Sequence, residues 1–115
     1  MMAMDWIEYL RESRKRAGGL MKVSPKLVAG FQAVSAKETT TGALEPKVRE
    51  LIALAVSITT RCEGCIAAHA SEARRLGVTD AELADALATA IALNAGAAYV
   101  YSGRALEAFE QFKSA

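Results

Sequence analysis

The sequence contains few of the residues that interrupt helices or carry chemistry. Its 115 residues include two prolines, two cysteines, one histidine and one tryptophan, but 24 alanines. Alanine has the highest helix propensity, so this composition favours an all-α protein. An excess of one charge is also missing, because 14 Lys and Arg balance 13 Asp and Glu to a net charge of +1. This balance argues against nucleic-acid binding, which usually needs a basic face.

Long, strongly hydrophobic runs are missing as well. The longest weakly polar run, Ala86 to Tyr101, is mostly alanine and includes Thr89 and Asn94. A membrane-spanning helix needs about 20 predominantly apolar residues, so no span is expected. The first residues also lack the apolar stretch and cleavage site of a secretory signal. We therefore expect one soluble, cytoplasmic domain over residues 1–115, with its cysteines in a reducing compartment.

Hydrophobic periodicity and capping signals predict a small six-helix bundle. The predicted helices cover residues 3–16, 25–34, 46–58, 62–76, 79–94 and 98–112. Breaks are expected at Gly18-Gly19, Gly77 and Ala95-Gly96, with a polar loop over residues 38–42. Ser24-Pro25 and a capping box that begins at Thr79 mark two helix starts. The helix over residues 46–58 is apolar on most sides, which predicts a central position.

The last three predicted helices are rich in small residues, as in the run ALATAIALNAGAA. Small side chains bury little apolar area, so an isolated subunit is expected to be only marginally stable. We therefore expect a homo-oligomer, in which a second copy covers an apolar face.

One segment, RCEGCIAAH, holds both cysteines and the only histidine. On a helix, Cys62, Cys65 and His69 share one face, and Cys65 and His69 are one turn apart. Helix N-terminal amides and a neighbouring imidazole both lower the pKa of a thiol. We therefore assign Cys65 as the attacking thiol and Cys62 as its resolving partner. The reverse order, with Cys62 as the attacker, stays open.

This segment also admits other interpretations. A zinc site would need Cys62, Cys65 and His69 with a carboxylate such as Glu50 or Glu63, because no second cysteine pair or histidine is present. Covalent haem attachment requires histidine directly after the second cysteine, where this sequence has Ile66. The three residues could also be ordinary core residues, but their placement within eight positions argues against chance.

Glu50 is the fourth residue of interest. It precedes Cys62 by 12 positions on a mostly apolar helix, where a carboxylate is costly to bury without a partner. One interpretation turns Glu50 inward to orient His69. The other leaves it in solvent beside Lys47 and Arg49.

This spacing, Glu50 followed by the C-x-x-C-x-x-x-H segment, resembles the carboxymuconolactone decarboxylase-like superfamily, in particular its alkylhydroperoxidase AhpD-like branch. The segment GVTDAEL agrees with it in order and position, and the resemblance covers roughly residues 20–112. It implies an all-α fold, a trimer or hexamer, and thiol peroxidase or disulfide reductase activity without metal, flavin or haem. It also implies that Cys65 attacks the peroxide, Cys62 resolves, and His69 and Glu50 relay protons. The resemblance further implies that a lipoyl-bearing protein or another thiol system supplies the electrons.

One departure is Gly64, where AhpD itself has a histidine between the two cysteines. Two rival functions accompany the peroxidase interpretation. In a lactone decarboxylase, His69 and Glu50 are the acid–base pair and the thiols are incidental. In a non-catalytic redox sensor, the dithiol reacts without turnover.

Overall fold

The computed structural model describes residues 4–35 and 40–114, and its regular elements are all helical. The five α-helices and one short 3₁₀ helix are α1 (Trp6–Val23), α2 (Pro25–Ser35), α3 (Pro46–Thr60), α4 (Glu63–Arg75), α5 (Asp80–Gln111) and η2 (Phe112–Ser114). The all-α prediction is confirmed. The predicted helix start at Ala3 and part of the predicted loop, Glu38 and Thr39, lie outside the described residues.

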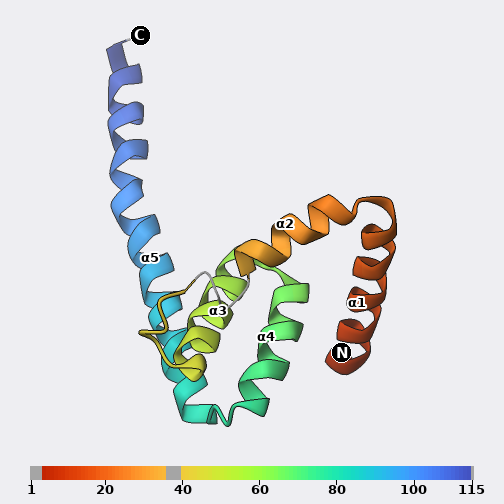
Figure 1. Cartoon of the computed structure of the whole chain (residues 1–115). Coiled ribbons are helices and arrows are strands. Elements are labelled where there is room, and N and C mark those ends of the chain that lie inside the picture. Colours follow the sequence, from red (N-terminus) through yellow and green to blue (C-terminus); the bar gives the residue numbers. More distant parts are fainter. Residues whose placement is uncertain (1–3, 36–39, 115) are drawn as a thin grey trace.

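Helix α3 lies at the centre of the arrangement, as its apolar sequence predicts. It packs against α4 on one side and α5 on the other, while α1 packs on α4 and α2 on α1. Figure 1 shows the resulting order α5, α3, α4, α1 from left to right. Leu54 of α3, Ala73 of α4 and Val78 form the buried cluster, with Leu51 and Leu83 packed against it. The core is therefore shared by α3, α4 and the beginning of α5.

The turn from α4 to α5 follows the predicted signals closely. Gly77 has a φ of +81°, a left-handed conformation that glycine adopts without steric cost. Thr79 then caps α5, and the Glu82 side chain accepts a hydrogen bond from the Thr79 backbone in return. The predicted capping box is therefore confirmed, and it fixes where α5 begins.

The predicted break at Ala95-Gly96 is wrong, because α5 continues through it as one helix of 32 residues. A single glycine in a helix costs about 1 kcal/mol, and the neighbouring alanines favour the helix. Asn94 does not end the helix either, since its side-chain amide donates to the Ala90 carbonyl and to Thr59 Oγ1 on α3. Two predicted helices are therefore one.

The predicted end of the first helix at Gly18-Gly19 is also wrong. Helix α1 extends to Val23, and the backbone N–H of Ser24 donates to the Leu20 carbonyl at 2.8 Å. Glycine weakens a helix without removing its backbone hydrogen bonds, so flanking residues can carry the helix through. Helix α2 begins at Pro25 as predicted.

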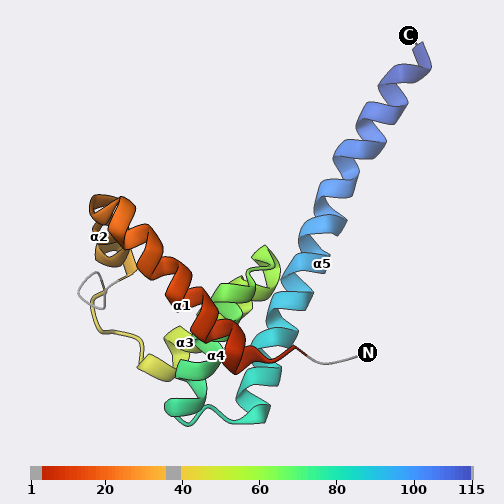
Figure 2. The same ribbon diagram turned by 90° about the vertical axis from the view of Figure 1, so that its right-hand side faces the viewer.

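The chain is extended for its size. Its radius of gyration is 19.0 Å, whereas a compact domain of this length has a radius of about 13 Å. The cause is visible in Figures 1 and 2, where the second half of α5 projects beyond the other helices. Every residue from Ile91 to Ser114 is exposed. Within the described residues, Asp80–Ser114 is the one helical segment long and apolar enough, by length and composition, to cross a membrane.

Candidate active site

The turn between α3 and α4 sets the position of Cys62. Arg61 ends α3 in the left-handed conformation, with φ 56° and ψ 50°. The backbone N–H groups of Arg61 and Cys62 both donate to the carbonyl of Ser57, in the last turn of α3. Cys62 is therefore the N-cap residue of α4, and its Sγ accepts a hydrogen bond from the Cys65 N–H at 3.1 Å.

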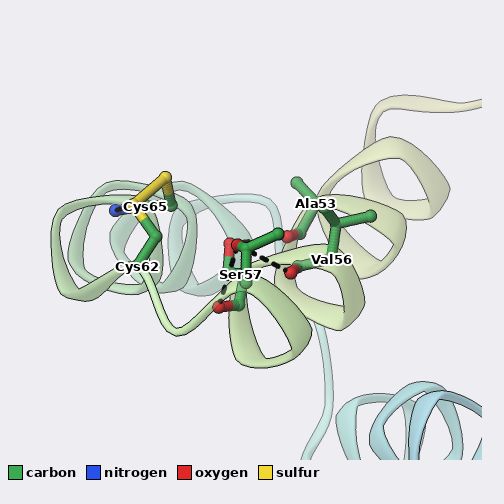
Figure 3. The surroundings of a disulfide bond; sticks show 6 residues. Ala53, Val56, Ser57, Cys62 and Cys65 are labelled. Carbon is green, nitrogen blue, oxygen red and sulfur yellow. Dashed lines mark hydrogen bonds between the residues drawn. A yellow bond between two sulfur atoms is a disulfide. The ribbon is translucent and has the colours of Figure 1, made fainter. Parts of the chain in front are cut away.

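Cys62 and Cys65 form a disulfide across the first turn of α4 (Figure 3). Their Cα atoms are 5.2 Å apart, which is within the usual range for disulfides. Both residues are partly exposed, so a small reductant can reach the bond. The structure thus shows that the C-x-x-C spacing brings the two sulfurs together on one side of the helix.

Glu50 and His69 lie next to each other across the interface between α3 and α4. His69 Nδ1 is 2.7 Å from Glu50 Oε2. The Glu50 side chain is 17% exposed and that of His69 is 40% exposed. Of the two interpretations of Glu50, the structure therefore supports the one in which it turns towards the histidine.

This contact determines which histidine nitrogen is available for proton transfer. A carboxylate accepts hydrogen bonds, so Nδ1 of His69 carries the proton that it donates to Glu50. In the neutral imidazole, Nε2 is then the unprotonated nitrogen and can accept a proton. Within the described residues, Glu50 supplies the one hydrogen bond of the His69 ring. His69 lies one turn after Cys65 on α4, so its ring is placed on the dithiol side of that helix.

An ion pair that was not predicted from the sequence lies on the same side of α4. Arg75 donates from Nε to Glu72 at 2.9 Å and makes a second, parallel contact to the other Glu72 oxygen. This hydrogen bonding and the Glu72 charge raise the pKa of Arg75, and the charge of Glu50 adds to the effect. A signal was available, since Cys65, His69, Glu72 and Arg75 follow one another at three- and four-residue intervals. Arg75 thus contributes positive charge near Glu50.

The residues predicted as possible zinc ligands do not form a ligand set. Within the residues that the structure describes, no group of three or more His, Cys, Asp and Glu side chains is arranged to hold a metal ion. The two cysteine sulfurs are bonded to each other, and the imidazole Nδ1 is engaged by Glu50.

Comparison with known proteins places the chain in a family. A model of the carboxymuconolactone decarboxylase family matches residues 25–111, which include the whole site. The chain therefore belongs to the carboxymuconolactone decarboxylase family.

Three relatives are similar to this chain over most of their lengths. An uncharacterized protein of Haemophilus influenzae is 54% identical over 98% of this chain and 100% of its own length. An uncharacterized protein of Cupriavidus necator is 33% identical over 95% of this chain and 96% of its own. A Paracoccus denitrificans protein named uncharacterized protein 4 in cox locus is 36% identical, over 74% of this chain and 77% of its own.

Proposed function

We propose that this protein is a thiol-dependent hydroperoxidase of the AhpD-like type that cycles between a dithiol and the Cys62–Cys65 disulfide. The observation that carries the proposal is the disulfide one helical turn before a histidine whose Nδ1 is hydrogen-bonded to Glu50. A dithiol supplies the two electrons that reduce a peroxide, and an oriented imidazole supplies the proton transfer.

In the first step, His69 Nε2 accepts the proton of Cys65, and the thiolate attacks one oxygen of a hydroperoxide. An S–O bond forms and the O–O bond breaks, so Cys65 becomes a sulfenic acid. The leaving alkoxide takes the proton back from the imidazolium and departs as an alcohol. Glu50 stabilises the imidazolium through its contact with Nδ1.

In the second step, the Cys62 sulfur attacks the sulfenic sulfur of Cys65, and the hydroxyl group leaves as water. The product is the disulfide. The 5.2 Å separation of the two Cα atoms suits the disulfide and also lets the thiol reach the sulfenic acid before the bond forms. An external dithiol, such as a lipoyl-type group on a partner protein, then reduces the disulfide. The sum is one hydroperoxide and one external dithiol converted to an alcohol, water and an external disulfide.

The hydrogen bond at the N-cap favours attack of the external thiolate on one of the two disulfide sulfurs. Cys62 Sγ accepts the Cys65 N–H, and an amide donor stabilises sulfur as a thiolate. Cys62 is therefore the better leaving group, and an incoming thiolate attacks the Cys65 sulfur.

The proposal also includes the location and assembly of the protein. We expect it in the cytoplasm, where thiols are kept reduced, as a trimer or hexamer without metal or organic cofactor.

The test is consumption of an alkyl hydroperoxide with a dihydrolipoyl compound as electron donor. Cys65→Ser is expected to abolish it, whereas Cys62→Ser is expected to consume one equivalent and then stop at the sulfenic acid. Glu63→Gln, an exposed change within the same motif, is the matched control and should retain activity. Mass spectrometry of the reduced protein after one equivalent of peroxide should show the loss of two hydrogens. Full activity in Cys65→Ser would overturn the proposal.

The family name points to lactone decarboxylation as the competing activity. The Glu50–His69 contact involves neither sulfur, so the pair could serve an acid–base reaction by itself. Turnover of a muconolactone by the double variant Cys62→Ser, Cys65→Ser would select that function instead.

A further inference from the structure

A groove of about 570 Å³ runs between α1 and α4, which pack side by side (Figures 1 and 2). Large side chains of α1 and small ones of α4 form its apolar floor: Trp6, Ile7, Leu10, Ala67 and Ala70. Small-molecule sites in proteins usually have volumes of about 300–1,000 Å³, so a ligand of modest size fits here. We call this surface the α1–α4 groove.

The α1–α4 groove is short and narrow. The lining residues of α1 run from Trp6 to Arg14, a distance of roughly 12 Å at 1.5 Å per residue. The groove volume over that length gives a mean cross-section on the order of 50 Å². A helix with its side chains is about 10–12 Å wide and needs a larger cross-section, whereas an extended alkyl chain fits.

Three arginines stand at the edge of this floor, and none of the lining residues is acidic. Arg11 and Arg14 are three residues apart on α1, which makes them neighbours on one side of that helix. Arg74 approaches from α4. Arg11 is paired with Glu8, and Arg74 lies 3.7 Å from Asp80. Arg14 makes no ion pair within the described part of the chain.

This concentration of positive charge favours an anionic ligand. Like charges on adjacent helical turns repel one another, and an anion bound between them removes that cost. The guanidinium group presents its N–H donors in a planar fork that matches the two oxygens of a carboxylate. Arg14 and its neighbour Arg11 therefore suit a carboxylate at the end of an apolar chain.

A second groove shows what the arginines add. It lies between α3 and α5, has a volume of about 330 Å³, and its apolar lining includes Ile52, Val56 and Leu93. None of its lining residues is charged. Its chemistry therefore selects no particular head group, whereas the α1–α4 groove combines an apolar floor with fixed positive charge.

We propose that the α1–α4 groove is a binding site for a free alkyl carboxylate of medium chain length. The alkyl chain lies along Trp6, Leu10 and Ala70. The carboxylate accepts hydrogen bonds from the Arg14 guanidinium and is further attracted by Arg11. Burial of the alkyl chain supplies affinity, and the arginines select the charged end.

This site is separate from the dithiol. Ala67, Ala70 and Arg74 lie across α4 from Cys65, on the side that faces α1. A ligand in the groove therefore leaves the disulfide accessible to an external thiol. The proposal does not depend on the thiol chemistry, and its test applies to the protein in either oxidation state.

Trp6 provides the first test, because it is the single tryptophan of the chain, lines the groove and is 40% exposed. Decanoate, whose extended length is close to that of the groove, is the probe and is used below its micelle-forming concentration. Its binding should shift the Trp6 emission to shorter wavelength, since the alkyl chain displaces water from the indole. The titration should saturate at one decanoate per chain, and calorimetry should give the same dissociation constant.

Changes in the head group separate charge recognition from simple hydrophobic association. Decanol has the same alkyl chain without the charge, and its dissociation constant should be about tenfold or more higher. Decyltrimethylammonium, which carries the opposite charge, should bind more weakly still. Added salt should weaken the binding of decanoate more than that of decanol, because salt screens exposed charges.

Substitutions test the two parts of the site. Arg14→Gln should raise the dissociation constant for decanoate by about tenfold or more and leave that for decanol unchanged. Lys15→Gln is the matched control, since it removes the same charge from α1 at an exposed position outside the groove, and it should change the constant by less than about twofold. Ala70→Phe fills the floor and should weaken both ligands. Helix content by circular dichroism should be the same in all four proteins.

The proposal is overturned if decanoate gives no saturable binding, which is the result expected where a second copy or a partner protein already fills the groove. Equal affinities for decanoate and decanol, or equal affinities of the wild type and Arg14→Gln for decanoate, would also overturn it. So would binding to lipid vesicles without binding to free decanoate.

Discussion

His69 Nδ1 lies 2.7 Å from Glu50 Oε2, so residues 19 positions apart in the sequence form one acid–base unit. Helix α3 supplies the carboxylate and α4 the imidazole, and the same two helices carry the core residues Leu54 and Ala73. The pair is therefore held by the best-packed part of the chain. In the proposed thiol cycle, this packing holds the imidazole in one orientation beside the reacting sulfurs.

Replacing Glu50 should slow the reaction with peroxide. It should not affect the reduction of the Cys62–Cys65 disulfide to the dithiol. Glu50→Gln retains an acceptor for Nδ1 but removes the charge that stabilises the imidazolium. We expect the single-turnover rate of peroxide reduction to fall by about 10- to 100-fold. Stopped-flow measurement on the reduced protein checks this, with Glu12→Gln as the exposed control. An unchanged rate in Glu50→Gln would remove Glu50 from the mechanism.

The hydrogen bond to Cys62 Sγ should make this sulfur reactive when Cys65 is absent. In Cys65→Ser, the N–H of residue 65 still donates to the N-cap position. Alkylation of Cys62 should therefore have its midpoint at a pH below about 8.5, the value for a free cysteine. Iodoacetamide rates measured as a function of pH check this. A midpoint at or above that value would show that the helix terminus gives no stabilisation.

Position 61 should accept glycine with less loss of stability than it accepts any β-branched residue. Its φ of 56° lies in the left-handed region, where side chains of L-residues cost about 1 kcal/mol or more. We expect Arg61→Gly to leave the free energy of unfolding unchanged or to raise it by up to about 1 kcal/mol. Arg61→Val should lower it by at least about 1 kcal/mol. Urea denaturation checks both, and equal stability of the two variants would contradict the assignment of this turn.

Glu82 should contribute stability that is lost in acid. Hydrogen bonds from the Thr79 backbone and from Lys47 hold the pKa of Glu82 below its usual range. The folded-state pKa is thus lower than the unfolded one. The contribution is present above the unfolded value, near about 4.3, and disappears as pH falls through the folded value. The melting temperatures of the wild type and Glu82→Gln should therefore differ at pH 7 and converge as the solution is acidified, whereas a constant difference would contradict this.

Local chemistry made much of the fold predictable. Ser24-Pro25, Gly77 and the Thr79–Glu82 capping box each set a helix boundary through short-range contacts, and the structure places all three boundaries as expected. The errors at Gly18-Gly19 and Ala95-Gly96 share a cause. Glycine lowers helix stability by a modest amount, and the residues on either side decide whether the helix ends.

In the candidate site, relationships within one helix were predictable from the sequence, whereas relationships between helices were not. The shared face of Cys62, Cys65 and His69 follows from spacing within one helix, so the sequence was sufficient. The direction of Glu50 depends on how α3 packs against α4, and the sequence left two possibilities open. Arg75 was missed because its relation to Glu50 crosses the same interface.

The disulfide encloses just Glu63 and Gly64, within the first turn of a helix that the Ser57 carbonyl and the α3–α4 interface already position. So short a loop removes far less freedom from the unfolded chain than a bridge between distant segments does. Opening and closing the bond therefore changes the chemistry at the helix end and leaves the scaffold nearly as stable as before. In the proposed cycle, repeated oxidation and regeneration therefore proceed without a weakened intermediate that invites proteolysis.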